Sequence, residues 1–484
     1  METKHIYILL AVIFILSCIF NSFILFSKPL NEDAYFSLRY VENIKENFLP
    51  LFNDNLSYGG RSIEEPFLFY YLLALFSLIH ISLIKIIPIL LASSLVLITF
   101  LISINFTSKR LSLIPAIFAG FVPAMFGMNL ISSTILAFPI LFLLLYSLNK
   151  LENPLFLYLF LILSFILPLV SFLSIFYIFA ILIYILIMGI EKKRIMGLEK
   201  EALIFSLFVN IFITLFLFRN SLLAYGPAFI LQNVPLAILA DFFKEFTLIK
   251  TLGSIGIATL VFGASGFIFS FREKNSLFLS SFLITSLIFL WLKLVPFENG
   301  LIIFSLTLAS LSALSLKNFN SYIKQTKFSK YKEKIIVWIF IIVILLSVVP
   351  SAFAVITFQS KVSKETFVAL KFFSEENKDK VILAPYEYGH AITYLGNKNV
   401  ADSLFLLAPL PEKRVKDIDL VYISQSESLV LEVSKRYLVD FIIFDKYISE
   451  KYEIQKLPFV EDKKCFSKVY DKNEVEIYRV KPAC

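Results

Sequence analysis

The residues of this sequence that could do chemistry are carboxylates outside its long apolar stretches. Asp33 directly follows the first of these stretches, and Glu298 lies in a polar segment far downstream. A carboxylate within hydrogen-bond reach of a hydroxyl or amide can act as a general base, which typically accelerates a reaction by about a hundred- to ten-thousand-fold. Any acid in such a segment is therefore a candidate catalytic residue, and Asp33 and Glu298 are two of several. For Glu298, a solvated loop residue is the alternative.

Two cations, Arg39 and Lys293, could neutralise an anionic group such as a phosphate that leaves in a reaction. Arg39 is preferred because an arginine pairs with phosphate through two hydrogen bonds, whereas a lysine acts as a point charge. Lys293 has a competing explanation as a snorkelling residue at the end of an apolar stretch. If Mg²⁺ or Mn²⁺ takes part, Asp33 and Glu298 are the expected ligands, with waters and phosphates completing an octahedron.

The segment around Asp33 is predicted to be an amphipathic helix lying at a membrane surface. Apolar residues recur at helical spacing from Phe36 to Ile44, as expected for a helix with one buried face. A purely structural explanation also fits, because Asn31 is a natural N-cap and acids in a first turn are favoured by the helix dipole. Periodicity alone leaves both explanations open.

The composition identifies the chain as a polytopic α-helical membrane protein. Of its 484 residues, 58% are hydrophobic and 17% are charged, compared with about 25% charged in an ordinary soluble domain. Several stretches run for about twenty residues without an ionisable side chain, which is the length needed to cross about 30 Å of hydrocarbon. The first stretch is too long for a secretory signal and is predicted to be a retained span.

Eleven spans are predicted, at about 6–26, 83–105, 111–128, 134–148, 154–169, 170–189, 202–218, 251–271, 276–291, 301–316 and 335–355. The apolar segment 66–81 is interpreted as interfacial, because a span there would move the basic loop at Lys109 and Arg110 to the opposite side. The loops rich in Lys and Arg then share one side, which the positive-inside rule makes the cytoplasm. These loops contain Lys109-Arg110, Lys150, Lys192-Lys193-Arg194, Arg272 with Lys274, and 317–334. We therefore expect a cell-membrane protein with a cytoplasmic N-terminus and an external C-terminal domain.

The distribution of charge counts against two classes of function, whereas the cysteines leave their pairing open. The net charge of +8 is explained by the cytoplasmic loops and requires no nucleic-acid partner. After Lys85 no ionisable side chain lies well inside a predicted span, which counts against an ion-coupled transporter. Cys465 and Cys484 flank a predicted hairpin, and the sequence leaves a disulfide and two free thiols as open alternatives.

The chain is divided into a membrane domain, 1–355, whose first outer loop covers 28–82, and an external α/β domain, 356–484. In the external domain, spacing and β-propensity predict helices and strands in turn. The expected elements are helices at 366–373 and 426–437, strands at 381–384 and 439–444, and a hairpin at 466–480 that turns at 471–473.

Two motifs resemble a known family. Asp33, Arg39 and the sequence Val41-Glu42-Asn43 are similar to the first outer loop of the catalytic subunit of oligosaccharyltransferase, a GT-C membrane glycosyltransferase. The stretch 385–392, Pro-Tyr-Glu-Tyr-Gly-His-Ala-Ile, resembles that family's Trp-Trp-Asp-Tyr-Gly-x-x-Ile signature at the corresponding place in the external domain. The order of parts also agrees, so the resemblance covers nearly the whole chain.

The resemblance implies a polyprenyl (dolichyl)-phosphate or -pyrophosphate sugar donor and an extracytoplasmic acceptor. It implies that Asp33 is a catalytic residue and that Glu298, in the late outer loop where the family has another functional acid, is a second one. It also implies that the turn containing Glu387, Tyr388, Gly389 and His390 contacts the acceptor. Two departures change the expectation: the segment 128–134 has no carboxylate where the family has an acid pair, and Pro385-Tyr386 replaces the tryptophan pair. We therefore expect an acceptor other than a standard N-glycosylation sequon.

The sequence thus predicts a GT-C type membrane glycosyltransferase. The missing acid pair supports a rival from another class, a catalytically inactive member whose external domain binds glycans or a partner protein. A transporter of lipid-linked sugars is a third possibility, and the charge-free spans weaken it.

Overall fold

The computed structural model describes residues 3–128, 130–195, 197–242, 247–460 and 465–481. The chain forms two compact units that interleave along the sequence. Unit 1 comprises Met1–Ser27, Glu65–Leu217 and Phe242–Phe358, and unit 2 comprises Lys28–Glu64, Phe218–Asp241 and Gln359–Cys484.

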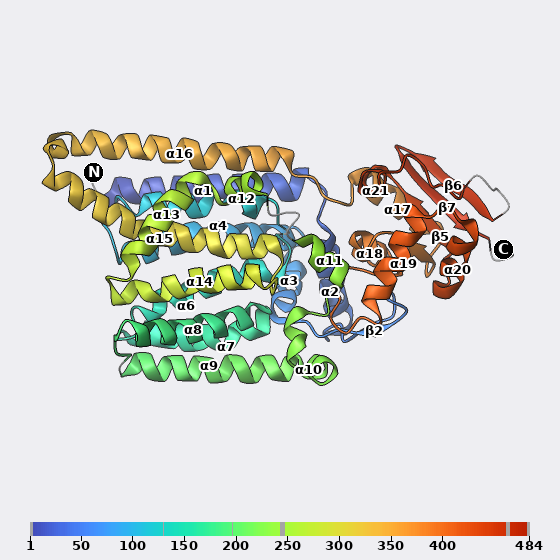
Figure 1. Ribbon diagram of the computed structural model, residues 1–484, viewed down its shortest axis with the longest axis horizontal. Coiled ribbons are helices and arrows are strands. Elements are labelled where there is room, and N and C mark those ends of the chain that lie inside the picture. The colour runs from blue at the N-terminus through green and yellow to red at the C-terminus, as the bar shows by residue number, and fades with distance from the viewer. Residues whose placement is uncertain (1–2, 129, 196, 243–246, 461–464, 482–484) are drawn as a thin grey trace. The chain divides into compact units, whose positions relative to one another are not determined.

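Unit 1 is a bundle of apolar helices, most of which run roughly parallel in Figure 1. Its helices are α1 Thr3–Ser27, α3 Leu68–Ile79, α4 Leu83–Ser103, α5 Leu113–Gly120, α6 Ser133–Leu148, α7 Pro154–Val170, α8 Leu173–Ile190, α9 Leu198–Leu217, α12 Leu248–Ile255, α13 Ile257–Ser270, α14 Leu277–Trp291, α15 Phe297–Gln325 and α16 Lys332–Thr357. Large apolar side chains are exposed along the outer helices, as expected where hydrocarbon replaces water.

Each of the eleven predicted spans corresponds to an apolar helix. Among the described residues, eight segments are long and apolar enough to cross a membrane, or nine if a bent pair counts as one span. Seven of these match predicted spans, and the bent pair, α12 with α13, matches the predicted span 251–271. The remaining three predicted spans match the shorter apolar helices α5, α6 and α7. The polytopic helical fold is confirmed.

The eighth long segment, Arg219–Asp241, was not predicted as a span, and it belongs to unit 2. It consists of α10 Arg219–Tyr225, a 3₁₀ turn Gly226–Leu231 and α11 Leu236–Asp241. Gly226, with a φ of 58°, adopts a backbone conformation that glycine allows and other residues rarely take. The segment is therefore a chain of short helices and does not form one continuous helix.

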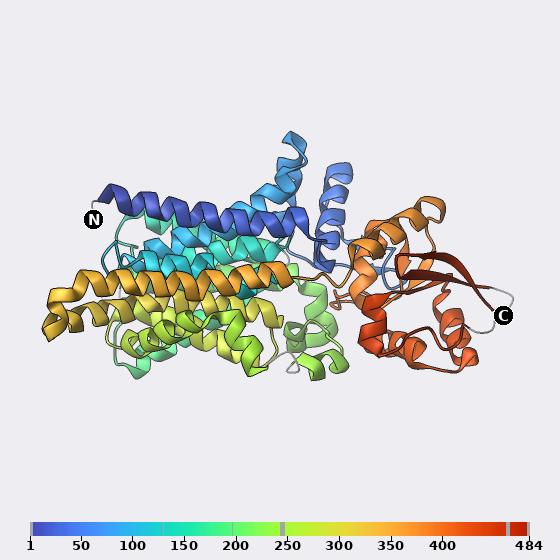
Figure 2. The same cartoon turned by 90° about the horizontal axis from the view of Figure 1, so that it is seen from above.

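The segment predicted to be interfacial contains α3, a helix of 12 residues. At 1.5 Å per residue it is about 18 Å long, too short to cross about 30 Å of hydrocarbon. Figures 1 and 2 show that α3 runs across the direction of α1, the orientation expected of a helix lying along the membrane surface.

The predicted basic loops gather at one end of unit 1. Arg110 forms an ion pair with Glu333 just inside α16, and Lys317 forms one with Glu273 after α13. Three further contacts join loops at this end: Lys109 to Tyr7, Lys193 to the carbonyl of Phe271, and Lys274 to Glu199. These contacts confirm a common side for the loops at Lys109-Arg110, 192–194, 272–274 and 317–334. The same side for Lys150, and the identity of this side as the cytoplasm, stay predictions.

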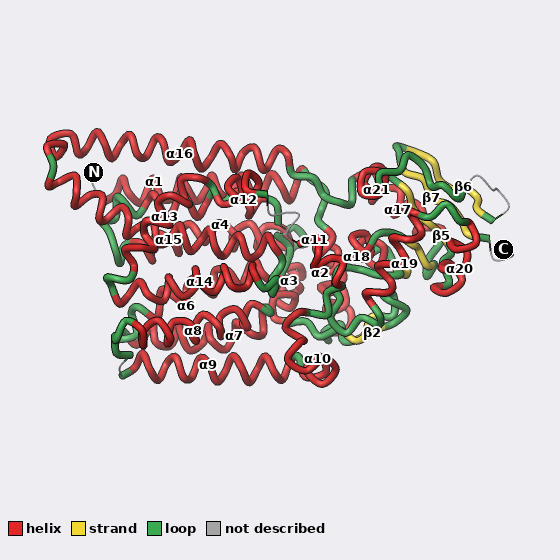
Figure 3. Tube along the Cα trace, viewed as in Figure 1, coloured by secondary structure: helices red, strands yellow, loops and turns green. Residues whose placement is uncertain are grey.

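Unit 2 contains a five-stranded mixed sheet, whose strands are shown in yellow in Figure 3. The strand order is β4-β3-β5-β7-β6, with β3 parallel to β4 and β5, and with β7 antiparallel to β5 and β6. The strands are β3 Val381–Leu383, β4 Lys398–Asn399, β5 Phe441–Phe444, β6 Phe466–Lys472 and β7 Val475–Val480. All four residues of β5 are buried, in line with the predicted buried-strand run.

The helices of unit 2 are α2 Glu32–Asn47, α17 Lys364–Glu376, α18 Gly389–Tyr394, α19 Pro411–Ile423, α20 Glu427–Tyr437 and α21 Lys446–Tyr452, besides α10 and α11. A short hairpin, β1 Asn53–Asp54 with β2 Arg61–Ser62, follows α2. Both predicted helices of the external domain, both predicted strands and the hairpin are confirmed, so the α/β class is correct.

The terminal hairpin differs from its prediction at the turn. Asn473 and Glu474 both have positive φ angles, 52° and 62°, the conformation of a two-residue turn that matches the twist of the strands. The turn thus comes later than the predicted 471–473. Cys465, just before β6, is disulfide-bonded, and Cys484 lies outside the described residues.

Candidate active site

The N-terminal turn of α2 carries the main candidate, Asp33. Asn31 has the extended backbone of an N-cap residue, but its side chain makes no capping hydrogen bond, so the structural explanation lacks its expected bond. The face of α2 that includes Tyr35, Phe36 and Tyr40 is buried, and the Tyr35 ring stacks on Phe367 of α17 at 4.9 Å between centroids. This packing fixes the helix within unit 2.

The side chain of Asp33 is exposed and is held from one side. Its Oδ1 accepts a hydrogen bond of 3.0 Å from the Ser403 hydroxyl. The second carboxylate oxygen, Oδ2, does not take part in this hydrogen bond, so its lone pairs can accept from another donor. The arrangement suits a carboxylate that must orient or deprotonate an incoming hydroxyl or amide.

The position of Ser403 depends on its neighbour Asp402, which is fully buried. Arg61 of β2 donates two hydrogen bonds to this carboxylate, at 2.9 and 3.0 Å, and Ser57 donates a third at 2.5 Å. Burial is the largest single effect and would raise the pKa of Asp402. The charges of Arg61 and His390 and the hydrogen bonds from Ser57 and the Leu404 N–H together outweigh burial and hold that pKa below its usual value. Asp402 is therefore the ionised centre that joins the first loop to the loop after β4.

Gly389 lets the turn 387–390, called the motif turn from here on, approach Asp402 closely. Its backbone is helical, with a φ of −54°, so no special conformation is required. A Cβ at this position would lie 2.7 Å from the Cα of Asp402 and closer still to the carbonyl oxygen of Ala401. The glycine thus marks a close backbone approach, because no larger residue fits there.

His390 and Tyr388 are buried in the same region. The His390 Nδ1 is 3.6 Å from Asp402 Oδ2, and the ring lies 5.2 Å from that of Phe36 on α2. The Tyr388 hydroxyl donates to Asp445 Oδ2 at 2.6 Å, and Asp445 in turn caps α21. These side chains link the motif turn to the core of unit 2.

Glu387 is also buried, and its carboxylate accepts hydrogen bonds from Lys451 at 2.9 and 3.0 Å and from the Tyr447 hydroxyl at 2.9 Å. Burial raises the pKa of Glu387, but Lys451 and Lys361 outweigh burial, so the net pKa is below its usual value. The structure brings all four predicted acceptor residues together and buries them. Their contact with an acceptor stays a prediction.

Glu32, next to Asp33, belongs to this charge cluster. Its side chain is 17% exposed and lies 3.4 Å from the Lys361 Nζ. Burial is the largest effect on its carboxyl, and together with the charges of Asp33 and Glu387 it outweighs Lys361 and raises the pKa of Glu32 to about 8. Near neutral pH Glu32 is therefore mostly protonated.

Arg39, the predicted phosphate-binding residue, is held by an acid that the sequence did not single out. Its Nη1 donates to Asp54 Oδ2 at 2.9 Å, and its Nη2 donates to Asp54 Oδ1. Asp54 is 1% exposed, whereas Arg39 is 14% exposed. The pair fixes the guanidinium plane, and phosphate binding by Arg39 stays a prediction.

Glu298 and Lys293 belong to unit 1, whereas Asp33 and Arg39 belong to unit 2. Glu298 is exposed in the first turn of α15, and its Oε1 would be 3.8 Å from a Cβ placed on Gly127. Gly127 immediately precedes the segment 128–134, which contains no carboxylate. Lys293 follows α14 with a φ of 57°, so it lies in a turn beyond the end of the helix.

The part of the chain that the structure describes contains no group of three or more His, Cys, Asp or Glu able to hold a metal ion. The assignment of Asp33 and Glu298 to Mg²⁺ or Mn²⁺ stays a prediction, and no step of the reaction proposed below passes through a metal.

Sequence reasoning missed several residues that organise the site: Asp54, Arg61, Lys361, Asp402, Ser403 and Lys451. None lies in a recognisable motif. Arg61 and Asp402 are 341 positions apart, so no local spacing could connect them.

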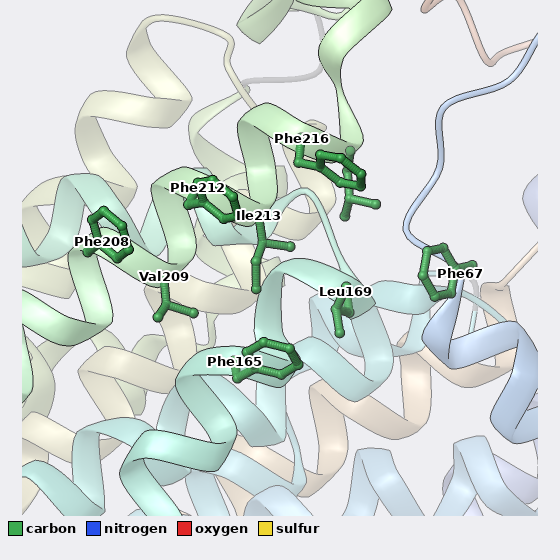
Figure 4. A pocket seen from close by; sticks show the side chains of 9 residues that line it. Phe67, Phe165, Leu169, Phe208, Val209, Phe212, Ile213 and Phe216 are labelled. Atoms are coloured by element: carbon green, nitrogen blue, oxygen red, sulfur yellow. The ribbon is translucent and has the colours of Figure 1, made fainter.

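An apolar groove on the side of unit 1 offers no catalytic group. Its volume is about 310 Å³, and Figure 4 shows side chains of α7 and α9 along it, with Phe67 from the start of α3 nearby. The lining consists of Phe67, Phe165, Leu169, Phe208, Val209, Phe212, Ile213, Phe216 and Leu217. Such a surface suits a hydrocarbon chain and cannot orient a polar substrate.

No protein-family model matches the sequence, and no curated protein matches it either. Solved structures of an oligosaccharyltransferase from Archaeoglobus fulgidus do match the fold. The complex with Zn and sulfate is 15% identical with a TM-score of 0.62, and the match covers 97% of this chain and 73% of that one. The enzyme tethered to an acceptor peptide with the NVT sequon is 14% identical with a TM-score of 0.61, covering 98% and 74%.

A third structure from the same organism, in complex with an inhibitory peptide and a dolichol-phosphate, is 13% identical with a TM-score of 0.59 and the same coverage, 98% and 74%. At these identities the likeness shows the fold. Taken with the bundle of apolar helices and the α/β unit, it establishes that this integral membrane protein has an oligosaccharyltransferase-like GT-C fold over nearly its whole length.

Proposed function

We propose that the protein is a membrane glycosyltransferase that moves a sugar or oligosaccharide from a polyprenyl-phosphate or -pyrophosphate donor to an extracytoplasmic acceptor. The observation that supports this most is the exposed Asp33 carboxylate, fixed by Ser403 at the start of a helix, in a chain with an oligosaccharyltransferase-like fold. The similar structures hold an acceptor peptide and a dolichol-phosphate. Those ligands set the chemical class of the proposed substrates.

In the proposed reaction, Asp33 accepts the proton of an acceptor hydroxyl or amide. The electron pair released on the acceptor atom forms the bond to C1 of the sugar, while the C1–O bond to phosphate breaks and its electron pair leaves with the phosphate. Arg39 stabilises that developing charge through the N–H groups that Asp54 does not occupy, because a guanidinium has five donors. Asp54 thus serves as a positioning residue for Arg39.

The acceptor is proposed to differ from a standard sequon. Pro385-Tyr386 replaces the tryptophan pair of the resembling family, and Tyr386 packs against Phe405 and beneath the Lys451 ammonium. The buried turn 387–390 then acts by holding Tyr386 and the loop of Ser403. We therefore propose that the turn contributes to acceptor binding mainly by positioning Tyr386 and the loop of Ser403.

A substitution of Asp33 tests the proposal. Asp33→Asn keeps the size of the side chain and can still accept from Ser403, so a structural role predicts a loss of only some tenths of a kcal/mol. A lost base predicts at least about a hundredfold slower transfer, near 2.7 kcal/mol in barrier. The measurement compares both proteins in membranes supplied with labelled lipid-linked donor, with protein level and thermal stability followed alongside.

The same assay separates the rival function. A catalytically inactive glycan- or partner-binding member is favoured by one observation, the absence of any carboxylate from the segment 128–134. If wild type and Asp33→Asn both fail to transfer sugar but both bind glycan, the inactive member is correct. Undiminished transfer by Asp33→Asn would instead move the base to another residue.

A further inference from the structure

The connection between α15 and α16 projects from the end of unit 1 that carries the basic loops. It comprises the last turns of α15, a 3₁₀ turn Lys327–Tyr331 and the start of α16, and it is called the 317–334 hairpin below. Figures 1 and 2 both show that it extends beyond the other helices of unit 1. With 29 residues, α15 is about 44 Å long, about 14 Å more than the hydrocarbon thickness.

The 317–334 hairpin is strongly cationic, and few of its lysines are paired with an acid. It contains six lysines and a single acid, Glu333. Glu333 is paired with Arg110, and Lys317 is paired with Glu273. Among the described residues, none forms an ion pair with the remaining lysines, which are Lys324, Lys327, Lys330, Lys332 and Lys334. The described residues therefore supply no acidic surface that neutralises these five lysines.

Aromatic side chains alternate with these lysines and are also exposed. Phe319, Tyr322, Phe328 and Tyr331 have exposed fractions between 39% and 68%. A topology signal requires only an excess of Lys and Arg and does not explain exposed rings. Rings that present an apolar face and a polar edge are favoured at the level of lipid headgroups, where lysines also find anionic partners.

The neighbouring part of α16 identifies the surroundings of the hairpin. Immediately after Lys334, the side chains of Val337, Trp338, Ile341 and Ile342 are exposed apolar groups on a membrane-spanning helix. Hydrocarbon must cover them, so headgroups lie within a few residues of the lysines. This continuity favours a lipid over a soluble acidic partner. We propose that the 317–334 hairpin is a binding surface for the anionic headgroups of the membrane in which the protein is embedded.

The two tryptophans of the chain provide a direct test. Trp338 is six residues after Lys332, about 9 Å along the helix, and its side chain is 64% exposed. Trp291 is at the end of α14 that lies opposite the basic loops. In a Trp291→Phe protein reconstituted in phosphatidylcholine vesicles, fluorescence of Trp338 reports the local lipid. We expect brominated phosphatidylglycerol to quench it at a mole fraction at least about fivefold lower than brominated phosphatidylcholine, since each lysine near the surface contributes about 1 kcal/mol.

Two comparisons assign that preference to the hairpin. The preference should disappear in Lys324→Gln/Lys327→Gln/Lys330→Gln and at about 1 M salt, where the screening length is about 3 Å. It should persist in Lys364→Gln/Lys371→Gln/Lys413→Gln, which removes the same charge from exposed positions of unit 2.

The reverse tryptophan variant, Trp338→Phe, reports from Trp291 and should show no such preference. Equal quenching of Trp338 by the two lipids would overturn the proposal. So would a preference that survives the hairpin substitutions, since a partner other than these lysines would then hold the lipid.

Discussion

Glu387 is buried against Lys451 and Tyr447, so its removal deprives the Lys451 ammonium, which is 24% exposed, of its carboxylate partner. We expect Glu387→Ala to lower the stability of unit 2 by about 3 kcal/mol, the usual cost of breaking a buried pair. A double variant with Lys451→Met should recover part of that loss. Thermal unfolding of the single and double variants measures both effects.

The acceptor role of Glu387 is tested on the same variants at a temperature at which they are folded. If the motif turn positions the acceptor-binding surface, the KM for acceptor should rise while donor binding is unchanged. A parallel loss of donor binding would assign Glu387 to folding alone.

Glu32 makes the stability of the folded protein depend on pH, and the direction follows from its raised pKa. Its carboxyl has a pKa of about 8 in the folded protein, above the ordinary value of 4.5. The folded state therefore holds the proton more tightly, and the stability that this contributes is complete below about pH 4.5 and is lost as the pH rises through about 8. Glu32→Gln, which cannot ionise, should be no more stable than wild type at pH 5.

At pH 8.5 we expect the unfolding midpoint of Glu32→Gln to exceed that of wild type by at least about 3 °C, the shift that 1 kcal/mol produces in a unit of this size. Glu46→Gln changes an exposed acid on the same helix and serves as the matched control. A difference between wild type and Glu32→Gln that is the same at both pH values would contradict the raised pKa.

At the scale of residues, the sequence offered candidate site residues but not the partners that hold them. Asp33 was singled out by its place after a span, and the structure leaves it exposed. The partners that fix Asp33 and Arg39, namely Ser403 and Asp54, were not predicted, because a hydrogen bond between distant segments depends on the packing of unit 2. Burial of the motif turn was also missed, since charged and tyrosine side chains carry no sign of burial in their types alone.

Helices α13 and α15 approach closely because α13 presents two glycines to its neighbour. A Cβ on Gly266 would lie 2.6 Å from the carbonyl carbon of Leu311 and closer to its oxygen, and Gly263 faces Leu308 in the same way. Contacts of this kind are typical of membrane helices, where close backbone packing replaces the hydrophobic effect between helices.

We expect Gly266→Ala to force α13 and α15 apart and to lower the yield of folded protein in detergent, with a loss of stability of about 1–3 kcal/mol from overpacking. Gly189→Ala in α8, where nothing lies within 4 Å of the new Cβ, should have little effect. The measurement is the thermal midpoint of the purified proteins. Equal midpoints for the two variants would show that the helices can separate at little cost.

The elements were largely predictable because hydropathy and length decide whether a segment spans a membrane. What the sequence could not specify is how a span is built. The bend of 78° between α12 and α13 occurs at Gly256, whose φ is 87°. A single glycine within an apolar run does not predict such a bend, since glycine is common in membrane helices.

The orientation of the whole molecule is a prediction of the basic loops, which the structure gathers at one end of unit 1. A reporter fused after Lys324 should be cytoplasmic, and one fused after Cys484 should be external. Activity of a reporter that works on only one side of the membrane measures each position. Finding both fusion points on the same side would remove the proposed reaction at the outer face.

The ion pair between Arg61 and Asp402 sets an order of events during synthesis. Both side chains are fully buried, yet the ribosome adds Asp402 341 positions after Arg61, which takes about 20–70 s at ordinary elongation rates. During that interval the guanidinium must stay hydrated, so the first loop cannot reach its final structure while most of the helices are being inserted. A chain whose synthesis stops before residue 402 would keep the first loop unfolded, and the quality-control machinery of the cell could then recognise it.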